Sequence, residues 1–192
     1  MANPIPALVT GGYRWTSITV ADRHTCGVTT AGVGHCWGTD SFGSLGGSSN
    51  RSTPVAGGHT WASIDAGNDR TCGLTTAGAA YCWGRNNDGH LATGDSTPRS
   101  VPTAVAGGHT FASVHGDDHH CGVTTAGAAY CWGIGGPGAA TSGRLGDGST
   151  SWSAAAPVLV SGSHTWDSGI ATWHTTCGVT TAGVGYCWGD NR

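Results

Sequence analysis

Residues 72–84 read CGLTTAGAAYCWG, and the same pattern occurs three more times in the chain. The other copies are CGVTTAGVGHCWG from Cys26, CGVTTAGAAYCWG from Cys121 and CGVTTAGVGYCWG from Cys177. Successive copies begin 46, 49 and 56 residues apart. An internal repeat of this length is typical of folds that stack copies of one small unit.

An aromatic residue precedes the first cysteine of every copy by 10 or 11 positions, at Trp15, Trp61, Phe111 and Trp166. A short segment rich in proline and valine comes before each aromatic residue, as at Pro102 to Val105. Short apolar segments at regular spacing, separated by glycine-rich turns, predict β-strands and leave no room for helices. Each repeat therefore predicts four short antiparallel strands.

One such sheet cannot bury both of its faces, so neighbouring sheets must cover it. The sequence accordingly predicts an all-β fold, a propeller-like array of four blades within one repeat domain, 1–192. The expected blades are 4–46, 47–94, 95–150 and 151–192.

The repeat resembles the RCC1 (regulator of chromosome condensation) repeat, in a cysteine-containing form of bacterial type. The resemblance lies in HTCGVTTAG, YCWG, WASI and the GRLGDGS of Gly143 to Ser149, and it covers nearly the whole chain. It implies a β-propeller with four-stranded blades, usually seven to a ring. It also implies a protein of the scaffold, exchange-factor or inhibitor type, although no residues for the nuclear exchange-factor role can be mapped here.

The eight cysteines form four pairs with one spacing, and each pair predicts a disulfide: Cys26 with Cys36, Cys72 with Cys82, Cys121 with Cys131, and Cys177 with Cys187. A Thr-Thr-Ala-Gly turn with a left-handed glycine pairs Thr29 with Val33 and places Cys26 opposite Cys36. A non-hydrogen-bonded pair of this kind has Cα atoms about 4.5 Å apart, within reach of a disulfide. Free buried thiols are the alternative. Zinc is disfavoured because no C-x-x-C spacing occurs.

Four disulfides predict an oxidising location, extracellular or periplasmic, although residues 1–12 lack the features of a signal peptide. Charged residues make up only 10% of the chain and its formal net charge is −3, which disfavours nucleic acid as a partner. No apolar stretch is long enough to span a membrane.

No catalytic motif or phosphate-binding loop occurs, so neither an enzyme nor a cofactor is expected. The densest group of metal-capable side chains is 115–120, HGDDHH. Most of it aligns with the repeat framework, so no metal site is expected.

The tryptophans of the Trp-Gly pairs (Trp37, Trp83, Trp132 and Trp188) adjoin a cysteine and are expected in the core between blades. Trp152 and Trp173 break the repeat pattern and are expected to be exposed. His59, His109 and His164 recur in one turn and are expected to be structural.

The loop before the first cysteine differs in every repeat, although the framework around it is constant. Repeat folds place such tips on one face, which often binds partners, and drift in solvated loops is the alternative. The candidate contacts are Asp22, Arg23, His24, Asn68, Asp69, Arg70, Asp117, Asp118, His119, Trp173 and His174. They predict an exported binding module for a protein or glycan. The alternative is a unit that self-associates through open blade edges into rings or filaments.

Overall fold

The computed structural model describes residues 8–9, 11–48, 53–117, 119–135, 143–167, 170–172 and 175–189. The regular elements in these ranges are β-strands in four antiparallel sheets. The first sheet contains β1 (Trp15–Val20), β2 (His24–Thr29) and β3 (Gly34–Gly38). The second contains β4 (Trp61–Gly67), β5 (Arg70–Thr75), β6 (Ala80–Gly84) and β7 (Arg99–Ala104). The third contains β8 (Phe111–Gly116), β9 (His119–Thr124), β10 (Ala129–Ile134) and β11 (Ser153–Leu159). The fourth contains β12 (Ala171–Thr172), β13 (Thr175–Val179) and β14 (Gly185–Gly189).

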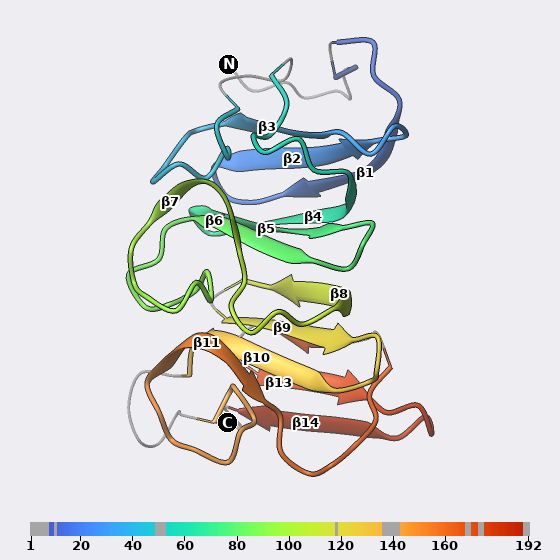
Figure 1. Ribbon diagram of the computed structural model, residues 1–192, viewed down its shortest axis with the longest axis vertical. Coiled ribbons are helices and arrows are strands. Elements are labelled where there is room, and N and C mark those ends of the chain that lie inside the picture. Colours follow the sequence, from blue (N-terminus) through green and yellow to red (C-terminus); the bar gives the residue numbers. More distant parts are fainter. Residues whose placement is uncertain are drawn as a thin grey trace.

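The four sheets stack on one another in chain order, with β1–β3 at one end and β12–β14 at the other (Figure 1). β1, β4, β8 and β12 are edge strands of their sheets, and each contacts the next, so we call them the inner strands. The all-β, blade-like architecture predicted from the repeats is confirmed, but the predicted four strands occur only in the second and third sheets, and the first and fourth have three among the described residues. The described ranges contain no helix that could cross a membrane.

The hydrogen-bonded sheets are offset from the predicted repeat units. β7 pairs with β6, so the proline-containing segment at the start of unit 95–150 is the outer strand of the second sheet. The edge position suits this segment, because Pro102 has no N–H to donate. In the first sheet the same pairing is reduced to one bridge, between His35 and Pro54. The first such segment, Pro6 to Val9, lies mostly outside the described residues.

The hairpin register agrees with the prediction in all four repeats. Thr29 N–H donates to the carbonyl of Val33, and Gly32 takes the left-handed conformation with φ 75°. The predicted cysteines lie directly opposite each other in every hairpin: Cys26 and Cys36, Cys72 and Cys82, Cys121 and Cys131, Cys177 and Cys187. Each pair is joined as a disulfide with Cα atoms 4.1 Å apart, a little closer than expected.

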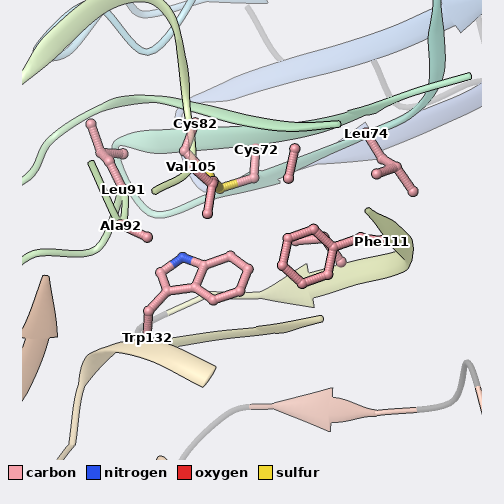
Figure 2. Close-up of a cluster of buried hydrophobic side chains, with 10 residues drawn as sticks. Cys72, Leu74, Cys82, Leu91, Ala92, Val105, Phe111 and Trp132 are labelled. Carbon is pink, nitrogen blue, oxygen red and sulfur yellow. A yellow bond between two sulfur atoms is a disulfide. The ribbon is translucent and has the colours of Figure 1, made fainter. Parts of the chain in front are cut away.

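Neighbouring sheets pack through one kind of interface, used three times. One sheet presents its disulfide, and the next covers it with the aromatic residue of its inner strand and the tryptophan of its Trp-Gly pair. Between the second and third sheets, Phe111 and Trp132 lie against the Cys72–Cys82 disulfide and Leu91 (Figure 2). The disulfides are therefore part of the apolar core as well as cross-links.

The last two disulfides differ in burial because, among the described sheets, another sheet covers the third but not the fourth. Cys121 and Cys131 of the third sheet are buried, in a cluster that contains Trp166 and is packed by Trp188. In the fourth sheet, Cys187 is exposed. The disulfide of this end sheet therefore cross-links its hairpin without joining a core between sheets.

Burial of the tryptophans follows from this packing. Trp83 and Trp132 are fully buried, whereas Trp37 and Trp188, in the two end sheets, are half-buried. Trp152 is 52% exposed, as its departure from the repeat predicts. Trp173 lies outside the described residues.

A glycine follows the first cysteine of every pair because an aromatic ring lies directly over it. A Cβ atom placed on Gly73 would lie 2.5 Å from the ring of Trp61. Gly27, Gly122 and Gly178 are covered in the same way by the aromatic residue of their own inner strand. The repeat therefore requires glycine at this position.

Histidine and tyrosine rings stack in every sheet, which supports a structural role for the repeated histidines. The ring centroids are 4.0 to 4.6 Å apart in the pairs Tyr13–His35, His59–Tyr81, His109–Tyr130 and His164–Tyr186. In the first sheet the two residue types have exchanged places. The stacked pair is thus kept although its sequence is reversed.

We expect Trp83→Ala to lower the free energy of unfolding by about 3–5 kcal/mol, because it empties a fully buried site at a sheet interface. The exposed Trp152→Ala should change it by less than about 0.5 kcal/mol. Denaturant unfolding followed by far-UV circular dichroism measures both. Equal losses in the two variants would contradict this packing.

Gly73→Ala should lower the free energy of unfolding by about 1–3 kcal/mol, because its methyl group would overlap the Trp61 ring. Gly185→Ala is the matched control, since nothing lies within 4 Å of a Cβ placed there and Ala80 and Ala129 occupy the same position in other repeats. The control should unfold like the natural chain. Tolerance of alanine at Gly73 would show that the ring can move aside.

Candidate functional site

A pocket of about 610 Å³ opens where the inner strands β1, β4 and β8 end. These strands run in the same direction, so the loops that follow them lie on one face of the stack. The pocket is lined by Val20, Ala21, Asp22, Ala66, Gly67, Asn68 and Asp117. Three of the predicted contacts, Asp22, Asn68 and Asp117, thus come together from three successive sheets.

Asp117 joins the second and third sheets at this pocket. Its Oδ1 accepts a hydrogen bond of 2.8 Å from the backbone N–H of Asn68. Its carbonyl oxygen accepts one from Nη1 of Arg70. Asp117 is therefore held in place, whereas the side chains of Asp22 and Asn68 project from loop tips.

Asp65, next to the pocket on β4, links all three inner strands. Its Oδ1 accepts from the Thr19 hydroxyl at 3.2 Å, and its Oδ2 accepts from the N–H of Gly116 at 3.3 Å. Burial raises the pKa of this carboxyl above its usual value, and the hydrogen bonds partly offset the effect. Sequence reasoning missed Asp65, although it stands where Thr19 and His115 stand in neighbouring repeats.

Three predicted contacts, His24, Arg70 and His119, are wrong as surface residues, because all three are buried. Each begins the second strand of its sheet, two positions before a cysteine, and faces the following sheet. The sequence could have indicated their burial, because residues i and i+2 of a strand share a face and each of these residues lies two positions before a cysteine.

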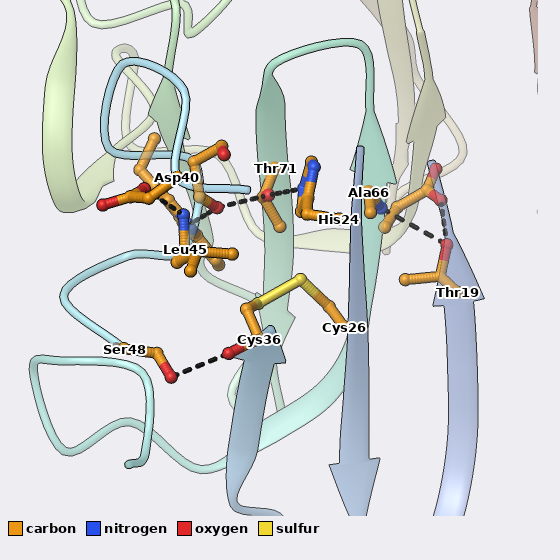
Figure 3. Close-up of a disulfide and its surroundings, with 12 residues drawn as sticks. Thr19, His24, Cys26, Cys36, Asp40, Leu45, Ser48, Ala66 and Thr71 are labelled. Carbon is orange, nitrogen blue, oxygen red and sulfur yellow. Dashed lines mark hydrogen bonds between the residues drawn. A yellow bond between two sulfur atoms is a disulfide. The ribbon is translucent and has the colours of Figure 1, made fainter. Parts of the chain in front are cut away.

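His24 and His119 hold neighbouring sheets together. Nε2 of His24 lies 2.8 Å from the hydroxyl of Thr71, which donates to the carbonyl of Ser44 at 2.8 Å (Figure 3). Since the hydroxyl proton is used there, Nε2 is the donor. Trp83 Nε1–H donates to the same carbonyl at 2.9 Å. Burial lowers the pKa of His24, so the neutral ring is favoured.

The same arrangement recurs between the third and fourth sheets. His119 Nε2 lies 2.6 Å from the hydroxyl of Thr176, and that hydroxyl and Trp188 Nε1–H both donate to the carbonyl of Arg144. These contacts belong to the sheet interfaces, so His24 and His119 are structural residues.

The remaining candidates do not line the pocket. Arg23 is exposed and Asp69 is half-buried. Asp118, Trp173 and His174 lie outside the described residues.

The pocket offers carboxylate and amide groups beside a few small apolar side chains, and its carboxylates suit acceptance of hydrogen bonds from N–H or cationic groups. Within the described part of the chain, no three His, Cys, Asp or Glu side chains are placed to hold a metal ion.

Two family models of the regulator of chromosome condensation (RCC1) repeat match the chain, over residues 61–89 and 77–123. A search of curated proteins gave no match. The matched segments contain the second hairpin, the outer strand β7 and the start of the third repeat.

Solved structures share the fold at low identity. Human WBSCR16 is 18% identical with a TM-score of 0.81, over 96% of this chain and 50% of that protein. Yeast RCC1 (Prp20), bound to Kap60, is 17% identical with a TM-score of 0.76, over 96% and 45%. The ectodomain of the Physcomitrella patens receptor kinase CR4 is 22% identical with a TM-score of 0.63, over 98% and 44%.

The chain spans about half the length of these solved relatives. Its fourfold hairpin repeat, the order of its strands and the two matching repeat models agree with one another. The chain therefore contains repeats of the RCC1 type, which the family models match over residues 61–123.

Proposed function

We propose that this protein is a non-enzymatic binding module that takes a protein partner on the loop face around the Asp22–Asn68–Asp117 pocket. The observation that carries the proposal is the convergence of variable loop residues from three sheets on one pocket. A constant framework with variable tips is the usual arrangement of a recognition surface in repeat proteins. The yeast relative was itself solved with a bound protein, Kap60.

The module works in an oxidising compartment, outside the cell or in the periplasm. Four disulfides, one in each repeat, support this location. Disulfides persist in exported proteins, whereas cysteines in the cytosol are kept reduced.

The test compares the natural chain with an Asp22→Ala/Asn68→Ala variant against secreted proteins and a glycan array. Both side chains lie on loop tips, so the stability of the variant should change by less than about 0.5 kcal/mol for each substitution. We expect the variant to lose at least tenfold in affinity for a protein captured by the natural chain.

Asp167→Ala is the control, because this exposed aspartate lies at the opposite end of the stack. It should bind like the natural chain. If the loop variant binds the protein ligand as tightly as the natural chain, this face is not the binding site. If the natural chain binds only glycans, the partner is a carbohydrate and not a protein.

A second candidate function, association between copies of the chain, is favoured by the exposed faces of the two end sheets. Ile18 is 45% exposed, whereas Ile64, at the same position in the second sheet, is 5% exposed. Val179 is 43% exposed, whereas the corresponding Val28 is 2% exposed. These are the two kinds of face that pack together inside the stack, so one copy could cover the other head to tail.

If copies associate in this way, Ile18→Asp should abolish the assembly, because a charge would be buried at the contact. Val101→Asp, on an exposed residue of the outer strand β7, is the control and should leave it intact. Sedimentation equilibrium measures the mass. A single-chain mass across a wide concentration range would rule association out.

A further inference from the structure

The interface between the second and third sheets departs from the other two. At those two, a threonine and a tryptophan share one loop carbonyl and a histidine binds the threonine. At this interface His120 replaces the threonine, and Arg70 replaces the histidine. The loop residue that corresponds to Ser44 and Arg144 is His90.

The imidazole rings of His90 and His120 are buried and have no hydrogen-bond partner among the described residues. They are 1% and 0% exposed. None of their four ring nitrogens, nor Nε1 of Trp132, has a hydrogen-bond partner in the described part of the chain. The ring of His120 stacks on Trp132, nearly parallel at 7°. Both imidazoles therefore sit in the apolar contact that holds the two sheets together.

The titratable and charged groups that act on these imidazoles are all basic. Arg70, Arg85 and His119 act on His90, and Arg70, His90, His119 and His115 act on His120. Arg70 lies on β5, His115 on β8 and His119 on β9, and Arg85 lies in the loop after β6. A proton on either ring would be desolvated and repelled.

Burial and these neighbours lower the pKa of His90 to about 3 and that of His120 well below its usual value. Both rings are neutral in the closed interface, and each would have its ordinary pKa of about 6.5 once exposed to water. Above pH 6.5 neither state binds a proton, so pH has no effect. Below pH 6.5 only the open state binds protons, and the closed interface loses stability until His90 itself titrates near pH 3.

We propose that the interface between the second and third sheets is an acid-labile joint, closed while His90 and His120 are neutral and opened by their protonation. Asn68 and Asp117 lie on opposite sides of it, joined by the hydrogen bond at the pocket. Opening would therefore divide the pocket, whatever the pocket binds.

The test uses substitutions that the chain already contains at its other interfaces. In His90→Ser/His120→Thr both residues match those of the first interface, Ser44 and Thr71. Hydrogen–deuterium exchange, corrected for intrinsic pH dependence, measures opening of β5–β6 and β8–β10 between pH 7.5 and 4. In the natural chain the opening constant should rise up to about tenfold per pH unit for each histidine below pH 6.5. In the double variant, the part of this pH dependence that is due to His90 and His120 should be lost.

His59→Tyr is the matched control, because Tyr13 occupies this position in the first repeat. It removes a histidine away from the joint and should keep the natural pH dependence. A natural chain whose second and third sheets stay equally protected from pH 6.5 to 4 would overturn the proposal, even if the variant failed to fold. An unchanged slope in the double variant would overturn it as well.

Discussion

The structure depends on one contact, the aromatic residues of one sheet packed on the disulfide of the sheet before it. Each hairpin is too small to bury both faces, and its Cys–Cys bridge adds apolar surface to one of them. The next repeat supplies two rings that fit this surface, as Phe111 and Trp132 do over Cys72–Cys82. The disulfide face of each sheet meets the aromatic face of the following sheet. Because the two faces differ, the same contact can be repeated from sheet to sheet, and the sheets stack in chain order.

This contact also decides which positions can vary. Residues on the strands between sheets are constrained, and the glycine under the ring, Gly73 and its counterparts, is constrained most. Loop tips beyond the strand ends carry no such requirement. Because the inner strands are held side by side, tips as different as Asp22, Asn68 and Asp117 still meet at one pocket. A rigid repeat thus produces a composite surface.

What the sequence predicted well was local. The turn fixes the hairpin register, and the period of two then places Cys26 opposite Cys36. What it did not predict depends on partners in another repeat. His24 looked like a variable loop residue because Arg70 stands in its place in the second repeat, yet its ring binds Thr71 of the next sheet. Asp65 was missed for the same reason, since the groups it joins lie in β1 and β8.

The repeats also serve as internal comparisons that separate tolerated substitutions from consequential ones. Tyr13 and His35 reverse the usual histidine–tyrosine order, but two flat rings still stack, so the exchange is self-compensating. The change from threonine to His120 gains a stack on Trp132 but no hydrogen bond, because its nitrogens find no partner among the described residues and Arg70 stands nearby. Departures from a repeat that leave buried polar atoms without a hydrogen bond are costly, and such costs are characteristic of functional sites. The one interface that breaks the rule lies directly beside the pocket, where Asn68 and Asp117 join the two sheets.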